Sequence, residues 1–132
     1  MITKFSISTD SRICFKDITY EISQCIENSK VKSGICCIFV PHTTAAVTVN
    51  ERADPNVMRD VTIALNKLIP FDDDYRHSEG NSAAHIKSSV IGASEMLPVE
   101  NGQLFLGTWQ AVFFCEFDGP RYRDVLLKII PT

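Results

Sequence analysis

Three histidines are the side chains of this 132-residue chain that are best suited to chemistry. His77 and His85 bracket a polar stretch that contains a glycine and an asparagine, and His42 directly follows a proline. Neutral imidazoles bind zinc, and a site with three of them leaves one coordination position for water or substrate. The spacing matches no fixed zinc motif, so metal ligation, metal-free acid–base chemistry or phosphate contact, and structural hydrogen bonding all stay open. Our hypothesis is that the segment around His42 and the stretch from His77 to His85 meet and form the functional site.

Two glutamates are the candidate general bases. Glu51 and Glu79 both lie beside other polar residues, and either could take up a proton or orient a histidine. The alternative for each is a solvated carboxylate. Asp54 has a different expected role, because an aspartate followed by proline is a typical helix start.

A turn near the carboxyl end of the chain could bind an anion. Residues 118–120 are Asp-Gly-Pro, which are typical turn residues whether or not the turn has a function. Arg121 and Arg123 follow this turn. Arginine offers a planar fork to phosphate or carboxylate, and the hydroxyls of Thr43 and Thr44 could donate to the same anion.

Polar residues elsewhere complete the predicted site. Asn81 lies within the histidine stretch, and Gln110 begins a strand where it could line a pocket, so both are candidate substrate contacts. Trp109 is expected in the core or a subunit interface more than in a ligand platform. The five cysteines contain no Cys-x-x-Cys pair and are expected to be small buried residues. Cys115 is the best candidate for a reactive thiol.

The patterns of apolar residues predict the elements that position these side chains. Alternating or continuous apolar runs indicate strands, and apolar stripes at helical spacing indicate helices. The predicted strands cover residues 4–9, 35–40, 45–50, 96–99, 104–106, 109–117 and 124–130, and the predicted helices cover 17–31, 55–69 and 82–92. Asn101-Gly102 is the strongest hairpin signal. We therefore predict one α+β domain over residues 1–132, with mostly antiparallel strands in a sandwich or barrel-like arrangement and two to three helices.

The composition excludes several classes of protein. Apolar residues make up 45% of the chain, charged residues 22%, and the net charge is −3. No run of one charge sign suggests a nucleic-acid or anionic membrane surface, and no apolar run approaches the roughly 20 residues that span a bilayer. The first residues lack the features of a signal peptide, so we expect a cytoplasmic protein without nucleic-acid or membrane partners.

Five segments together resemble a known family. They are His42-Thr43-Thr44-Ala45-Ala46, Asn50-Glu51 with Asp54-Pro55, the His77 to His85 stretch with Glu79-Gly80-Asn81, Gly107-Thr108-Trp109-Gln110, and Glu116-Phe117-Asp118-Gly119-Pro120-Arg121. In this order they are similar to the YjbQ-like family, also called the secondary thiamine-phosphate synthase family. The resemblance covers nearly the whole chain.

The resemblance implies a homotrimer whose site, near a subunit boundary, holds a divalent metal on His42, His77 and His85. It also implies an enzyme that acts on a phosphorylated small molecule by joining a pyrimidine pyrophosphate to a thiazole phosphate. Three imidazoles favour zinc, whereas departure of pyrophosphate usually uses magnesium. A zinc-dependent hydrolase and a non-enzymatic metal- or metabolite-binding trimer are therefore the alternative functions.

Overall fold

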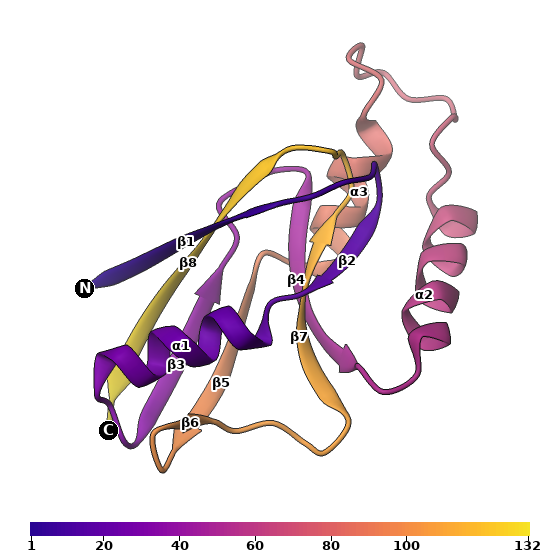
Figure 1. The fold of residues 1–132 in the computed structure, drawn as a ribbon. Helices are drawn as coiled ribbons and strands as arrows, with labels where there is room; N and C mark the ends of the chain where they lie inside the picture. The colour runs from indigo at the N-terminus through magenta and orange to yellow at the C-terminus, as the bar shows by residue number, and fades with distance from the viewer.

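The structure is a computed structural model that describes residues 1–132. Two antiparallel sheets and three helices make up the fold (Figure 1). In chain order the elements are β1 (Ile2–Ser8), β2 (Cys14–Asp17), α1 (Thr19–Ser29), β3 (Gly34–Phe39), β4 (Ala45–Glu51), α2 (Pro55–Leu68), α3 (Ser82–Ile91), β5 (Ser94–Glu100), β6 (Gln103–Leu104), β7 (Gln110–Glu116) and β8 (Tyr122–Pro131). The predicted α+β class with mostly antiparallel strands is confirmed.

The larger sheet has the strand order β1-β8-β3-β5-β6, and the smaller one has the order β2-β7-β4. The main core lies between them. It contains Ile22 and Ile26 of α1, Ile38 of β3, and Val112 and Phe114 of β7. The isoleucines of α1, which lie in the predicted helix 17–31, therefore point into the core.

Strand β7 is buried on both of its faces. Val112 and Phe114 face the main core, whereas Phe113 and Cys115 face a second apolar layer formed with α2 and α3. Trp109 was included in the predicted strand 109–117, but it lies in the turn before β7 and is 63% exposed. The smaller sheet thus lies between the main core and the helices α2 and α3.

The start of α2 follows its sequence signals. The Asp54 side chain accepts a hydrogen bond from the Asn56 N–H at 2.9 Å, and Pro55 occupies the first turn. Helix α3 ends at Gly92, whose φ of 102° suits a residue without a side chain. Asn101 and Gly102 have φ of 53° and 74°, as the predicted hairpin requires.

Two elements differ from the predictions. Strand β2 was missed because its four residues are too short to display an alternating pattern, and it forms only by pairing with β7. The return strand predicted at residues 104–106 is limited to Gln103–Leu104. Helix α2 ends at Leu68, just before Pro70, because proline cannot continue a helix.

Candidate functional site

His42 lies in the loop between β3 and β4 and is fixed by a strand of the larger sheet. Its Nε2 accepts a hydrogen bond from the backbone N–H of Asp124 in β8 at 2.9 Å. A ring nitrogen that accepts a hydrogen bond carries no proton, so the proton of the neutral ring lies on Nδ1. Nδ1 has no hydrogen-bond partner in the chain and is not buried. His42 therefore presents one N–H donor of defined position to whatever lies beside it.

The surroundings of His42 favour its neutral form. Burial lowers the pKa of the imidazole, and the nearby positive charge of Arg123 lowers it further, although the carboxylates of Asp124 and Glu116 act in the opposite direction. Burial disfavours a charged ring, and a neighbouring cation repels it. His42 is thus held as a neutral hydrogen-bond donor through Nδ1 around neutral pH.

His42 and His85 line the same surface hollow. Its volume is about 370 Å³, and its walls come from the β3–β4 loop and from α3 and the residues that follow it: His42, Thr43, His85, Ser88, Ser89, Gly92 and Ala93. The helix is fixed against β4 because the Ser88 hydroxyl donates to the carbonyl of Ala45 at 2.6 Å. The structure thus brings His42 and His85, from the two histidine segments, to one hollow.

The third imidazole touches the second. The rings of His77 and His85 are 5.2 Å apart between centroids and stand at 85° in an edge-to-face arrangement. His77 Nε2 is 3.9 Å from an exposed carboxylate oxygen of Glu79. His85 is therefore the central member of the group, with His42 across the hollow and His77 beside it.

The histidines do not fit a metal site within one protomer. No three histidine, cysteine, aspartate or glutamate side chains form a group that could hold a metal ion. The Nε2 of His42 is occupied by the Asp124 N–H, and its Nδ1 carries the proton. The predicted divalent metal, zinc or magnesium, thus stays a prediction, and no chemical step below depends on it.

Arg123, predicted to contact a substrate, instead forms a buried ion pair. It is 3% exposed, and its guanidinium donates to both carboxylate oxygens of Glu116, with the Nε bond at 2.9 Å, and to the Thr44 hydroxyl at 2.9 Å. Glu116 also accepts from the Thr9 hydroxyl at 2.7 Å. These contacts leave Arg123 and Thr44 inside the protein, where they join β4, β7 and β8 immediately below His42.

Arg121 is also paired within the chain. Its guanidinium donates to a carboxylate oxygen of Asp118 at 2.9 Å, and the amide of Asn81 donates to the same oxygen at 3.0 Å. The other amide atom of Asn81, Oδ1, is buried without a partner. The turn that follows β7 is thus tied to the start of α3.

Two predicted site residues lie away from the histidines. Glu51 ends β4, six residues beyond Ala45, which is about 20 Å along an extended strand. Its carboxylate accepts from the Asp54 N–H at 3.3 Å. Gln110 accepts from the Gly107 N–H at 2.8 Å and so closes its own turn. Neither side chain lines the hollow beside His42.

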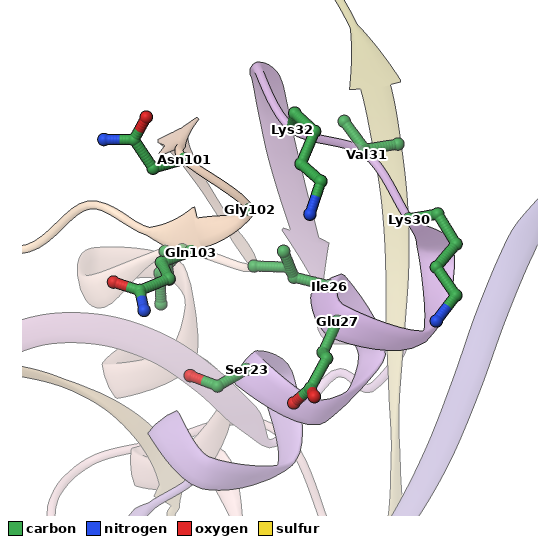
Figure 2. Close-up of a pocket in the computed structure, with 10 residues that line it drawn as sticks. Ser23, Ile26, Glu27, Lys30, Val31, Lys32, Asn101, Gly102 and Gln103 are labelled. Atoms are coloured by element: carbon green, nitrogen blue, oxygen red, sulfur yellow. The ribbon is translucent and has the colours of Figure 1, made fainter.

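A larger hollow than the one beside His42 lies elsewhere. It has a volume of about 560 Å³ and lies between α1 and the β5–β6 hairpin, where Lys30, Lys32 and Glu27 border it (Figure 2). None of the three histidines lines it. Cys115 lines neither this hollow nor the one beside His42. It is fully buried, and burial raises the pKa of its thiol, so it is not an activated nucleophile.

Comparison with known proteins places the chain in a family. The family model described as UPF0047 protein YjbQ-like matches residues 3–132. The chain belongs to the YjbQ-like family. It is 51% identical to a UPF0047 protein of Methanocaldococcus jannaschii over 98% of this chain and 94% of that protein. It is 45% identical to YugU of Bacillus subtilis over 98% and 99%.

Solved structures of YjbQ-like proteins have the same fold. A crystal structure of an uncharacterised family member from Clostridium acetobutylicum matches with a TM-score of 0.95 at 48% identity, over 97% of this chain and 99% of that one. A YbjQ-like protein of unknown function from Sulfolobus solfataricus matches with a TM-score of 0.95 at 33% identity, over 100% and 97%. The arrangement of two antiparallel sheets with three helices is therefore the fold of the family.

The comparisons correct the predicted function. The relatives are named only as UPF0047 proteins, and the solved structures are described as uncharacterised or of unknown function. None is named as a thiamine-phosphate synthase or as a metal-binding enzyme of phosphorylated substrates, so the function implied by the resemblance was wrong for this chain. The prediction that the chain belongs to the YjbQ-like family was right.

None of its helices is long and apolar enough to cross a membrane.

Sequence reasoning missed two polar residues of the interior. Glu116 lies in the predicted strand 109–117, but its partner Arg123 lies on β8 of the other sheet, so the apolar pattern of the sequence could not reveal the ion pair. Lys87 was not predicted as a site residue, although it shares the buried face of α3 with Ala83, Ala84 and Ser88. A lysine at a buried helical position was the signal that could have identified it.

Proposed function

We propose that the hollow lined by His42 and His85 is an acid–base site that transfers protons to and from a small polar molecule carrying a carbonyl group. The observation that carries the proposal is the hydrogen bond from the Asp124 N–H to His42 Nε2. It fixes the tautomer of one imidazole, as an enzyme requires of a proton donor. His85 then stands on the other wall of the same hollow and can accept a proton.

The chemical roles follow from the two environments. His42 donates a hydrogen bond from Nδ1 to the oxygen of a bound carbonyl group, which increases the acidity of the neighbouring C–H bond. His85 is part-exposed and is flanked by His77, so it is the group that takes up the released proton. The Thr43 and Ser89 side chains supply hydroxyl groups to the rim.

Exchange of carbon-bound hydrogen for deuterium tests this proposal without a known substrate. Dihydroxyacetone is incubated with the protein in D₂O, and loss of the C–H signal is followed by NMR. His42→Gln supplies an oxygen that can accept the Asp124 N–H in place of Nε2 but removes the imidazole Nδ1–H, and His85→Gln removes the base. We expect both variants to lower the enzyme-dependent rate by about 100-fold or more.

Glu51→Gln is the matched control, because Glu51 lies at the far end of β4. Its rate should stay within about twofold of the parent rate. Equal exchange by the parent protein and by His42→Gln, at any rate above buffer, would show that the hollow does not transfer protons.

A homotrimer is the expected assembly, and the outer face of the larger sheet supports it. Phe39, Met96 and Ile130 lie on that face and are all exposed, Met96 by 64%. Apolar residues gathered on adjacent strands mark an interaction surface. Light scattering should give about three times the chain mass of 14.8 kDa, and Met96→Glu should shift the protein to a smaller species.

The chemistry of the cysteines supports the expected cytoplasmic location. All five are free, and two of them, Cys36 and Cys115, are buried. Free thiols suit a reducing compartment.

A further inference from the structure

Lys87 is a buried amine without a carboxylate partner. The residue is 2% exposed, and its Nζ donates a hydrogen bond to the amide oxygen of Asn66 in α2 at 2.5 Å. No ion pair in the protein includes Lys87. Fully buried lysines are rare unless they are paired with an acid. The hydrogen bond joins α2 to α3, but a neutral glutamine or methionine could join the helices without burying an ammonium group.

A hollow lies against this amine. It has a volume of about 340 Å³, and both Lys87 and Asn66 line it. Its walls include the apolar side chains of Ile13, Phe71 and Phe117. Its lining differs completely from that of the hollow beside His42. Lys87 therefore borders a separate space large enough for a small organic molecule.

Two further side chains give this hollow the polarity of a ligand site. Arg12 stacks over the ring of Phe71, 4.3 Å from its centroid, and forms no ion pair within the chain. Asn81 also lines the hollow, and its Oδ1 is buried with no hydrogen-bond partner. A buried acceptor without a donor calls for an explanation, and a ligand that supplies the donor is one. The hollow thus offers a cation and an unfilled acceptor beside a buried amine.

The one acidic residue that lines the hollow does not neutralise the amine. Asp118 lines the same hollow, but its carboxylate receives hydrogen bonds from Arg121 and from Asn81. Burial lowers the pKa of Lys87, because no opposite charge stabilises its ammonium form. Neutral amines are nucleophiles, and desolvated lysines of this kind form Schiff bases.

The geometry points to a covalent ligand site in which the amine of Lys87 adds to the carbonyl of a small keto or aldehyde acid whose carboxylate lies at Arg12. The nitrogen lone pair forms the new C–N bond, and the carbonyl oxygen takes up the two amine protons and leaves as water. The product is an imine, and no oxidant or reductant takes part. The hydroxyl of the addition intermediate supplies the donor that Asn81 Oδ1 lacks.

Reductive trapping tests this site. The folded protein is incubated with pyruvate and cyanoborohydride at neutral pH, and the modified lysines are identified by peptide mass spectrometry. We expect Lys87 to be modified about tenfold faster than the exposed Lys67. Acetone, a ketone without a carboxylate, is the matched probe. Arg12→Gln should slow the reaction with pyruvate several-fold and leave that with acetone within about twofold.

A purely structural lysine gives a different result. If the amine only joins α2 to α3, Lys87 is modified more slowly than Lys67 by both ketones, and Arg12→Gln changes neither rate. That outcome overturns the proposal. Lys87→Met should lose the fast-modified peptide while circular dichroism shows a folded chain. If that variant does not fold, the comparison between Lys87 and Lys67 in the parent protein still decides the question, because it needs no substitution.

Discussion

Replacing Glu116 by leucine should destabilise the protein more than any other single change among the polar residues described above. The substitution leaves the guanidinium of Arg123 inside the protein with only Thr44 as a partner. It also removes the acceptor of the Asp118 N–H, whereas the Thr9 hydroxyl keeps a second acceptor, the Arg121 carbonyl. Breaking a buried ion pair by removing one partner typically costs about 3–5 kcal/mol, and we expect a loss in that range.

Urea unfolding followed by circular dichroism measures this loss. The control is the double variant Glu116→Leu with Arg123→Met, in which both charges are replaced by apolar groups of similar size. Because such a replacement is often close to neutral, the double variant should recover at least about 2 kcal/mol of the loss. A loss below about 1 kcal/mol for Glu116→Leu alone would refute our view that the pair fixes the junction of β4, β7 and β8.

The same pair predicts a dependence of stability on pH. Burial raises the pKa of Glu116, but the hydrogen bonds from Arg123, from Thr9 and from the Asp118 N–H outweigh it, and the pKa lies below its ordinary value of 4.5. The unfolded chain then binds a proton before the folded chain does. The stabilisation by Glu116 is therefore present above about pH 4.5 and is lost as the pH falls through the lower pKa of the folded state. Glu116→Gln should lack this component of acid unfolding.

Three further predictions concern single positions. Gly34→Ala should cost about 2 kcal/mol or more in urea unfolding, because the added carbon would lie 2.2 Å from the backbone oxygen of Ile130; an unchanged midpoint would mean that β3 and β8 are not so close. Asp54→Ala should cost about 1 kcal/mol through loss of the bond to the Asn56 N–H, and Asp54→Asn should restore most of it. The low pKa of His42 should reduce stability as the pH falls below its ordinary value of 6.5, since only the unfolded ring then takes up a proton; His42→Gln should remove that slope.

Most of the fold could be predicted because its signals are local. The isoleucine stripe of α1, the Asp54-Pro55 start of α2 and the Asn101-Gly102 turn each lie within a few residues of sequence. Strand β2 could not be found in this way. It is short and gains its identity from its pairing with Cys115 and its neighbours, about 100 residues later in the chain.

The candidate site was predicted less well, because its charges are paired across the sheets. The sequence brought His42, His77 and His85 to attention, and the structure gathers them around His85. The sequence could not reveal that Glu116 neutralises Arg123. That contact depends on the pairing of β7 with β4 and on the turn that leads from β7 into β8. The distance of Glu51 from the histidines likewise depends on the direction of β4.

The tautomer of His42 is the feature on which the proposed acid–base site depends most directly. Long-range ¹H–¹⁵N NMR spectra of the uniformly labelled protein, recorded at decreasing pH, distinguish protonated from unprotonated ring nitrogens. We expect His42 to show an unprotonated Nε2 and a protonated Nδ1, and to remain neutral below pH 6.5. A proton on Nε2 at neutral pH, or a His42 ring that becomes charged at or above pH 6.5, would contradict the proposed site.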